Sequence, residues 1–283
     1  MTDPVLKPFL SQLAFPESPR WHDGALWFSD FYTQRVQRVG MDGRCETVVS
    51  VPGQPSGLGW LPDGRLLVVS MTDRRLLRLD GQVLTEVADL SKLAPFHCND
   101  MVVDAKGRAY IGNFGFDLTA RETPRSTGLI LVLPDGQAKV VAQDLHFPNG
   151  TIITPDGRTL IIGESYASRL TAFDIAQDGS LSGRREWAKL DKATPDGICL
   201  DAEGAIWLAS PISREVIRVR EGGAVTHRIA TPGQALACML GGPGRRTLFV
   251  LLGKVMVTPE QSRQSLTGTI HTLRVTVPGA GLP

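Results

Sequence analysis

The stretch DGRTLIIGES at residues 156–165 contains the unit from which the rest of the sequence is built. It consists of a Gly-containing turn and a short apolar strand that ends in small or polar residues. Five more copies follow the same order: DGALWFSD (23–30), DGRLLVVS (63–70), KGRAYIGN (106–113), EGAIWLAS (203–210) and PGRRTLFVLL (243–252). Asp-Gly and related turns between runs of Val, Ile, Leu and aromatic residues are typical of β-hairpins, because Gly readily adopts the positive φ that these turns need.

The spacing of the copies indicates how many strands each unit holds. The turn glycines are Gly24, Gly64, Gly107, Gly157, Gly204 and Gly244, at intervals of 40 to 50 residues. Another apolar strand precedes most turns, as in SGLGWLP, and a third follows them, as in RRLLRLD. Units of roughly 40–50 residues with three or four strands match the blades of a propeller. The sequence predicts an all-β fold, a six-bladed β-propeller of four-stranded antiparallel blades around a central channel, in a single domain over residues 1–283.

Closure of this ring requires a strand from the N-terminal end. An unpaired sheet edge is prone to unwanted pairing. We therefore expect residues 5–15 to form a strand against TIHTLRVTV at 269–277.

Composition excludes several classes of function. The chain has 283 residues, of which 30 are basic and 29 acidic, so it offers no electrostatic reason to bind nucleic acid or an anionic membrane. The first residues, MTDPVLKPFLSQLAF, do not resemble a signal peptide, and the four cysteines are scattered without a CxxC pair. We expect a cytoplasmic protein with reduced thiols that acts on a small-molecule substrate, and the pattern makes no prediction of its oligomeric state.

One polar position recurs in the repeat, eight residues before the turn glycine. It is occupied by Ser56, Asn99, Asn149, Asp196 and Leu236, and in the shorter first unit by Glu17, seven residues before Gly24. Each of these residues begins the strand that leads into the turn. Because the inner strands of all blades surround the channel, Glu17, Asn99, Asn149 and Asp196 should converge at one mouth of it.

Two carboxylates and two amide carbonyls at one spot need a positive charge between them, because the carboxylates would otherwise repel each other. Such an all-oxygen set suits Ca²⁺ best, whereas Mg²⁺, Mn²⁺ and Fe²⁺ are alternatives and Zn²⁺ is less natural without His or Cys ligands. Asn149-Gly150 and Asp196-Gly197 are also dipeptides that form turns. Since the hairpin turn lies only later in each repeat, the pattern favours one divalent cation.

Four phrases resemble a known family. They are FPESPRW (15–21), CNDMVVDAKGRAYIGN (98–113), FPNGTIITPDGRTL (147–160) and TPDGICLDAEGAIW (194–207). They are similar to the SMP-30/gluconolactonase/luciferin-regenerating-enzyme family, and the similarity spans essentially the whole chain. The resemblance implies a six-bladed propeller with a divalent cation, typically a lactonase. It places Glu17, Asn149 and Asp196 on the metal ligands, Asn99 on a substrate- or metal-contacting asparagine, and Asp196 on the acidic residue proposed as general base.

The chain departs from the family pattern at two places. His97 stands where sugar lactonases of the family usually carry an arginine, and it is either a pocket wall or a group that donates a hydrogen bond or moves a proton. The segment NFGFDLTARETPRSTG at 113–128 replaces an acidic substrate contact. Loss of a guanidinium that would hold sugar hydroxyls, together with Phe114 and Phe116, favours a substrate less polar than gluconolactone.

Three functions fit these observations. The leading hypothesis is a metal-dependent lactonase in which Asp196 accepts the proton of an attacking water and Asn99 holds the carbonyl or that water. The second is a calcium-dependent phosphotriesterase of the diisopropyl-fluorophosphatase type, because the same oxygen set would serve it. The third is a non-catalytic binding propeller, which predicts an extended apolar or charged patch on an outer face.

Two further polar stretches have plainer interpretations. Cys98 lies beside Asn99, and strand alternation predicts that it packs into the blade rather than serving as a nucleophile. Glu164 and Ser165 end a central strand, where we favour the opening of a surface loop over a place at the channel mouth.

Overall fold

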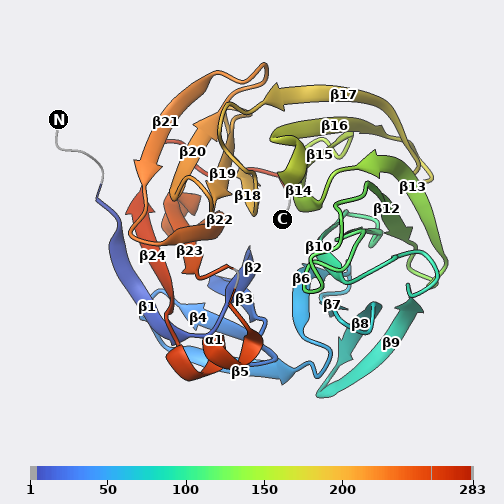
Figure 1. Ribbon diagram of the computed structural model, residues 1–283, viewed down its shortest axis with the longest axis horizontal. Coiled ribbons are helices and arrows are strands. Elements are labelled where there is room, and N and C mark those ends of the chain that lie inside the picture. The colour runs from blue at the N-terminus through green and yellow to red at the C-terminus, as the bar shows by residue number, and fades with distance from the viewer. Residues whose placement is uncertain (1–4, 256, 282–283) are drawn as a thin grey trace.

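Six four-stranded antiparallel sheets surround a central axis as the blades of a propeller (Figure 1). The structure, a computed structural model, describes residues 5–255 and 257–281. In five blades, four consecutive strands pair each with the next, from the innermost to the outermost. The predicted fold class, a six-bladed β-propeller of four-stranded antiparallel blades, is confirmed.

The strands fall into blades in chain order. Blade 1 contains β2 (Pro16–His22), β3 (Ala25–Asp30), β4 (Arg35–Gly40) and β5 (Cys45–Ser50), and blade 2 contains β6 (Pro55–Trp60), β7 (Leu66–Ser70), β8 (Arg75–Asp80) and β9 (Val83–Asp89). Blade 3 contains β10 (Cys98–Val103), β11 (Ala109–Asn113), β12 (Thr127–Val132) and β13 (Ala138–Leu145). Blade 4 contains β14 (Pro148–Ile153), β15 (Thr159–Glu164), β16 (Arg169–Ile175) and β17 (Leu181–Lys189). Blade 5 contains β18 (Ile198–Leu200), β19 (Ile206–Ser210), β20 (Glu215–Val219) and β21 (Val225–Ala230). Blade 6 contains β22 (Gln234–Gly241), β23 (Thr247–Gly253), β24 (Gly268–Arg274) and β1 (Lys7–Leu13).

The repeated glycines lie in the turns between the first and second strands of the blades. All six have φ between +65° and +85°. At Gly64, φ is +85° and no atom lies within 4 Å of the place where a Cβ would be. The backbone conformation alone therefore demands glycine there. We call the side of the ring that carries these turns the hairpin face, and the opposite side, where the first strands begin, the mouth face.

Ring closure follows the prediction. β1 pairs antiparallel with β24, with Lys7 opposite Thr272 and Leu13 opposite Gly268. Blade 6 is thus assembled from both ends of the described chain. The C-terminal segment makes a second contact that closes the ring, which was not predicted. It crosses the hairpin face to blade 5, where Asp201 and Gly279 form a β-bridge and the amide of Ala280 donates to the carbonyl of Leu200 at 2.9 Å.

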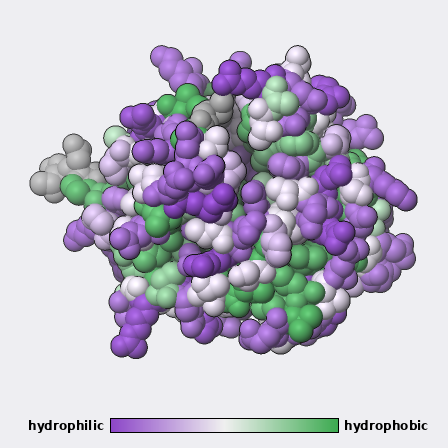
Figure 2. Space-filling view, turned by 60° about the horizontal axis from the view of Figure 1, so that its bottom comes forward, coloured by the Kyte–Doolittle hydropathy of each residue, from purple (hydrophilic) through white to green (hydrophobic). Residues whose placement is uncertain are grey.

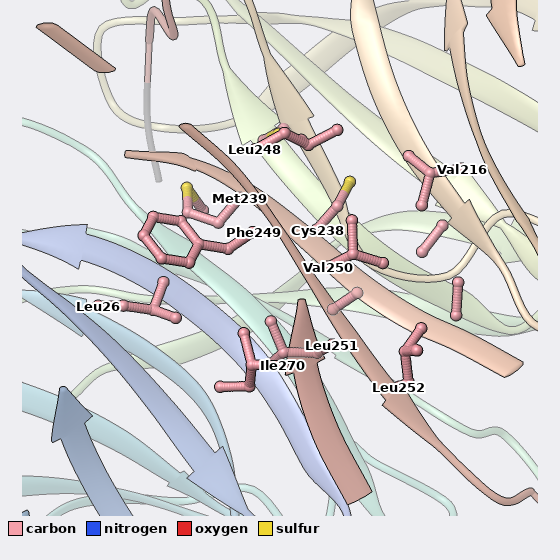
Figure 3. Close-up of a cluster of buried hydrophobic side chains, with 14 of the residues drawn as sticks. Leu26, Val216, Cys238, Met239, Leu248, Phe249, Val250, Leu251, Leu252 and Ile270 are labelled. Atoms are coloured by element: carbon pink, nitrogen blue, oxygen red, sulfur yellow. The ribbon is translucent and has the colours of Figure 1, made fainter. Parts of the chain in front are cut away.

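The hydrophobic core lies between neighbouring blades. In Figure 3, Leu26 of β3 and Val216 of β20 flank side chains of blade 6, among them Phe249 and Ile270. All seven residues of β23 are buried, whereas most residues of the outermost strand β21 are exposed. Burial therefore falls from the axis outward, and the innermost strands are held rigidly on both faces.

The two longest loops lie on the mouth face, on opposite sides of the channel. One joins β11 to β12 across residues 114–126, and the other joins β23 to β24 and contains helix α1 (Pro259–Ser265). Two short 3-10 turns, η1 (Ser165–Ala167) and η2 (Pro243–Arg245), complete the described elements. Thr258 and Gln261 form a capping box at the start of α1, and the hydroxyl of Ser262 donates to the carbonyl of Ala14 at 2.8 Å. Within residues 5–255 and 257–281, no helix is long and apolar enough to cross a membrane.

Exposed hydrophobic side chains are scattered around the molecule. Figure 2 shows one side, where hydrophilic residues cover most of the surface and hydrophobic ones gather in separate patches. The large exposed hydrophobic residues come from the N-terminal segment and from loops or strand ends of five blades: Val5, Met41, Val83, Tyr166, Ile212, Val225 and Leu266. This distribution does not favour a scaffold with one broad apolar docking surface.

Candidate functional site

The four predicted ligands lie at the starts of innermost strands on the mouth face. Glu17, Asn99 and Asn149 are the second residues of β2, β10 and β14, and Asp196 lies two residues before β18. Ser56 and Leu236 occupy the equivalent places in blades 2 and 6. The structure thus brings four polar side chains from four different blades to one end of the channel.

A β-bulge follows this position in the innermost strands of blades 1 to 4. In β2 the pairing moves from Glu17 opposite Ser29 to Arg20 opposite Trp27, three residues against two. The same extra residue follows Pro55, Cys98 and Pro148. Bulges break the alternation of a strand and redirect its side chains. Two consecutive polar residues, Asn99 and Asp100, are consequently both buried, the first bonding to blade 4 and the second to blade 1.

The glycines beside two of the ligands allow neighbouring blades to touch. A Cβ on Gly150 would lie 2.6 Å from the carbonyl oxygen of Asp196, and a Cβ on Gly197 would lie 2.4 Å from the Cβ of Ala237. Neither glycine has a positive φ. The amide of Gly150 donates to the carbonyl of Asp196 at 3.1 Å, and that of Gly197 to the carbonyl of Leu236 at 2.8 Å. Asn149-Gly150 and Asp196-Gly197 therefore form contacts between blades rather than turns.

Both asparagine amides are oriented by hydrogen bonds to the protein. Asn99 Nδ2 donates to the carbonyl of Pro148 at 3.3 Å, and Asn149 Nδ2 donates to Ser165 Oγ at 3.3 Å. No donor among the described residues engages either Oδ1. The two amides accordingly offer free carbonyl oxygens, which are the atoms that a hard cation accepts as ligands.

The two carboxylates carry an electrostatic conflict. Burial raises the pKa of Glu17, and the charge of Asp100 raises it further. Burial also raises the pKa of Asp196 well above its usual value, and the negative charge of Glu17 adds to this, while a hydrogen bond from Asn149 acts in the opposite direction. Burial and the neighbouring negative charges outweigh the hydrogen bonds from Asn149 and Ser18 and the charge of Arg20, which favour the ionised forms. A positive charge at this place would remove the conflict.

The surroundings fit an oxygen-binding divalent cation. Among the described residues no group of three or more His, Cys, Asp or Glu side chains gathers as a metal centre, because the set contains two carboxylates and two amides. The hydroxyls of Ser18 and Ser56 are buried beside this set and have no hydrogen-bond partner in the described part of the chain. Unpartnered buried oxygens are costly unless a cation or water satisfies them. Glu17, Asn99, Asn149 and Asp196 would hold the cation.

Arg20 and Asp100, which the sequence analysis did not identify, link blades 1, 2 and 3 next to this set. Arg20 of β2 donates through Nε to the carbonyl of Leu58 at 2.9 Å and through Nη2 to Asp100 Oδ1 at 2.5 Å. Arg20 and Asp100 are both about one-twentieth exposed or less. A buried ion pair of this kind fixes geometry even where its net stabilisation is small, and it positions Glu17 and Asn99 on either side.

Ser165 is a second residue that holds a ligand in place. Its hydroxyl accepts from Asn149 Nδ2 and donates to the carbonyl of Pro195 at 2.7 Å, next to Asp196. Glu164 is fully buried and forms ion pairs with Arg169 and Arg184. These two residues support the mouth of the channel, so the expectation that they merely open a surface loop is wrong. In the sequence, the only sign of this role is that Glu164 and Ser165 are polar and end an apolar strand.

The predicted substrate contacts lie above the ligands, in different environments. His97 is partly buried, its ring lies 4.0 Å from that of Phe96, and burial lowers its pKa while Asp117 acts in the opposite direction. Phe114 is partly exposed, and its ring lies 4.7 Å from that of Phe147. Phe116 is only 2% exposed and packs behind Phe147, so it supports the mouth from below rather than lining it.

Cys98 packs inside the blade, as alternation predicts. It is completely buried in the core cluster with Leu67, Val69 and Met101. Burial raises the pKa of its thiol to about 12. A thiol that stays protonated near neutral pH is a poor nucleophile.

Comparison with known proteins identifies a family and relatives that this chain resembles. Residues 15–254 match the family described as the SMP-30/Gluconolactonase/LRE-like region. Regucalcin of Oryctolagus cuniculus is 30% identical over 277 residues, which cover 91% of this chain and 89% of regucalcin.

Three solved structures share the fold. A luciferin-regenerating enzyme superposes with a TM-score of 0.84 at 20% identity, covering 99% of this chain and 98% of that one. A calcium-binding protein, regucalcin, from Agrobacterium tumefaciens gives 0.81 at 23% identity, covering 98% and 97%. A gluconolactonase from Xanthomonas campestris gives 0.77 at 24% identity, covering 98% and 91%.

Proposed function

The chain belongs to the SMP-30/gluconolactonase/LRE-like family, and from this premise we propose that it is a divalent-cation-dependent hydrolase that opens a lactone ring. The observation that carries the proposal is the meeting of the buried carboxylate of Glu17 with the partly buried carboxylate of Asp196, each of which has a raised pKa. Beside them stand two amides whose carbonyl oxygens are free. This donor set requires a cation and leaves a carboxylate next to it that can accept a proton.

The proposed cation is Ca²⁺, held by Glu17, Asn149 and Asp196 together with Asn99. Oxygen donors alone match the preference of Ca²⁺, whereas Mg²⁺, Mn²⁺, Fe²⁺ and Zn²⁺ are the alternatives to be compared with it. The similar fold of a regucalcin described as calcium-binding supports this choice. The chemistry that such a cation supplies is polarisation of the lactone carbonyl and a lower pKa for nearby water.

The protein residues transfer the proton and orient the reacting groups. Asp196 accepts the proton of the attacking water while the water oxygen bonds to the carbonyl carbon of the lactone. When the ring C–O bond breaks, the same carboxyl group returns the proton to the leaving ring oxygen, so one lactone and one water give one hydroxy acid. Asn99, fixed by the carbonyl of Pro148, holds the carbonyl or the attacking water in line. Glu17 and Asn149 mainly hold the cation.

The proposed substrate is less polar than gluconolactone. His97 and Phe114 supply flat ring surfaces at the mouth, where the family resemblance implies an arginine for sugar hydroxyls. Each hydroxyl buried without a partner costs roughly 1–3 kcal/mol. A polyol lactone would therefore lose binding here that an apolar lactone keeps. The proposal also places the protein in the cytoplasm, with its four cysteines as free thiols.

The test is hydrolysis by the purified protein of a lactone panel and of a phosphotriester panel, each with and without EDTA. Lactone turnover that EDTA removes and Ca²⁺ restores is the expected result. Faster turnover of phosphotriesters would instead identify a phosphotriesterase. Absence of turnover on both panels with every divalent cation tried would leave a binding propeller as the function.

A further inference from the structure

Five aromatic rings form a continuous group on one side of the channel mouth. We call Phe96, His97, Phe114, Phe147 and Tyr166 the aromatic wall. Phe96 and His97 lie just before β10, and Phe147 just before β14, while Phe114 follows β11 and Tyr166 lies within η1 after β15. All these segments belong to the mouth face of blades 3 and 4.

The rings touch one another in sequence along this side. The centroid distances are 4.0 Å between Phe96 and His97, 5.9 Å between His97 and Phe114, and 4.7 Å between Phe114 and Phe147. Phe147 and Tyr166 follow at 5.0 Å in an edge-to-face arrangement. Offset and edge-to-face contacts at these separations are the favourable geometries of aromatic pairs, so the rings hold one another in fixed orientations.

The wall is a surface and not a part of the core. Tyr166 is 51% exposed, and the other four rings are partly exposed. Phe116, by contrast, is 2% exposed and lies behind Phe147 and Tyr166, at 5.9 and 5.7 Å. A buried ring thus supports a layer of partly exposed rings on the mouth face.

Phe147 holds an uncommon backbone conformation to present its ring. Its φ is +57°, a region that bulky side chains rarely occupy. The amide of Ser165 donates to the carbonyl of Phe147 at 3.1 Å, and the amide of Tyr166 donates to that of His146 at 3.2 Å. Gln54, which occupies the equivalent position in blade 2, has a φ of +64°, whereas Phe15 and His97 in blades 1 and 3 have no positive φ. The conformation thus occurs in blades 2 and 4, and of these two residues only Phe147 carries an aromatic ring.

The wall begins within reach of the candidate ligands. His97 and Phe147 each precede a ligand, Asn99 and Asn149, by two positions. Two residues of extended chain span roughly 7 Å. The backbone of the wall therefore begins within about 7 Å of the candidate ligand Asn99.

We propose that the aromatic wall binds an aryl group, and hence that the substrate class is lactones carrying an aryl substituent next to the lactone ring. This proposal rests on the proposed function, because it assigns the substrate class of that same site. The wall contains no carboxylate, lysine or arginine. The ring faces of the wall can stack on an aryl group, and only the imidazole of His97 and the hydroxyl of Tyr166 could bond to the hydroxyls of a sugar.

The experiment compares two lactones that differ only in aromaticity. The substrates are γ-phenyl-γ-butyrolactone and γ-cyclohexyl-γ-butyrolactone, whose leaving groups are both secondary alkoxides and whose substituents have similar bulk. Binding of the corresponding lactams, 5-phenyl- and 5-cyclohexylpyrrolidin-2-one, is measured by calorimetry as a readout that needs no turnover. The variants are Tyr166→Leu, which removes the most exposed ring, and Tyr166→Phe, which keeps it. Tyr32→Leu is the matched control, because Tyr32 lies on the mouth face of blade 1 and packs on Phe15 at 5.0 Å, outside the wall.

The expected result is an aryl preference in both kcat/KM and lactam affinity. Tyr166→Leu should lower both for the phenyl compounds by roughly three- to tenfold. The cyclohexyl compounds should change by less than about twofold, as should all compounds with Tyr32→Leu. Tyr166→Phe, which keeps the ring, should retain the aryl preference. Equal values for phenyl and cyclohexyl compounds, or equal losses in Tyr166→Leu and Tyr32→Leu, would overturn the aromatic wall as an aryl site.

Hydrolysis and lactam binding together distinguish failure of the aromatic wall as an aryl site from failure of the proposed lactonase function. Hydrolysis of both lactones without aryl preference overturns the wall and keeps the lactonase. Aryl-selective lactam binding without hydrolysis, under every divalent cation added, keeps the wall and overturns the lactonase. Absence of both binding and hydrolysis overturns both proposals.

Discussion

Replacement of Gly150 by Ala tests whether the contact between blades 4 and 5 holds the candidate site in place. A Cβ at Gly150 would lie 2.5 Å from the amide nitrogen of Ile198 and 2.6 Å from the carbonyl oxygen of Asp196. Both are backbone atoms, which cannot rotate away, so the two inner strands must move apart. Overpacking of this kind costs about 1–3 kcal/mol. Loss of the hydrogen bond from Gly150 to Asp196, 3.1 Å long, adds about 0.5–1.5 kcal/mol.

We therefore expect Gly150→Ala to lower the free energy of unfolding by about 2–4 kcal/mol and to weaken cation binding, because Asp196 moves with its strand. The matched control is Gly233→Ala, where the nearest atom, Leu252 Cβ, would lie 3.8 Å away and φ is not positive. That change should be neutral or stabilising by up to about 1 kcal/mol. Urea unfolding followed by tryptophan fluorescence and calorimetric titration with Ca²⁺ measure the two effects. Equal unfolding midpoints and equal Ca²⁺ affinities in the two variants would refute the reasoning.

Four further changes address single residues. Asp196→Asn should lower kcat for lactones by roughly 10²- to 10⁴-fold with the fold intact, because the proton acceptor is lost; circular dichroism and steady-state kinetics measure this. Glu17→Gln should act mainly through cation affinity, so activity measured against rising Ca²⁺ should recover in part. His97→Arg should move the ratio of kcat/KM values toward gluconolactone and away from an alkyl lactone. Glu164→Gln should destabilise the fold by about 2 kcal/mol at neutral pH. Burial alone would raise the pKa of Glu164, but hydrogen bonds from Arg169, Thr171 and the amide of His146 outweigh it and hold the pKa below the ordinary value of 4.5. This stabilisation is complete above that value and is lost as the pH falls through the lower pKa of the folded state, so urea unfolding should show the variant and wild type converging in acid.

Each of these expectations has a result that contradicts it. Near-wild-type turnover of Asp196→Asn with cation bound would remove Asp196 as general base. Failure of Glu17→Gln to recover at any Ca²⁺ concentration would give Glu17 a role beyond ligation. An unchanged lactone preference in His97→Arg would show that this position does not set polarity. A stability gap that stays constant from neutral to acid pH would mean that Glu164 is not held ionised by its partners.

The propeller could be predicted because its hairpin turns leave a mark in the sequence. Gly24, Gly64 and Gly107 adopt the same positive φ in the structure, and few residue types other than glycine do so readily. Their spacing therefore reports the blade length directly. The position of β1 against β24 could also be predicted, because a ring of sheets must hide its free edge. Helix α1 was missed, since its seven residues are too few for a periodic pattern, although Thr258-Pro259-Glu260-Gln261 carries the capping-box signature.

The candidate ligands could be found by counting back from the turns, but their supports could not. Counting assumes regular strands, whereas a bulge follows Glu17 and another follows Cys98. Alternation consequently gives no prediction for Asp100, which turns toward Arg20 across blades. Phe147 and Tyr166 escaped notice for a related reason, because their meeting depends on the left-handed backbone at Phe147. Such contacts arise from irregular backbone, which repeats do not encode.

The pairing of β1 with β24 also sets an order of events during synthesis. Blades 1 to 5 end at Ala230, yet blade 6 lacks its outer strands until residues 268–274 leave the ribosome. Until then β1 has no partner, although β22, the main neighbour of β2 in blade 6, has already been made. Contacts between distant parts of a chain form late, because closing a long loop is entropically costly. The nascent propeller therefore remains an open arc until β24 has been made, and closure of the ring, rather than completion of any single blade, fixes the relative positions of the ligands from blades 1, 3, 4 and 5.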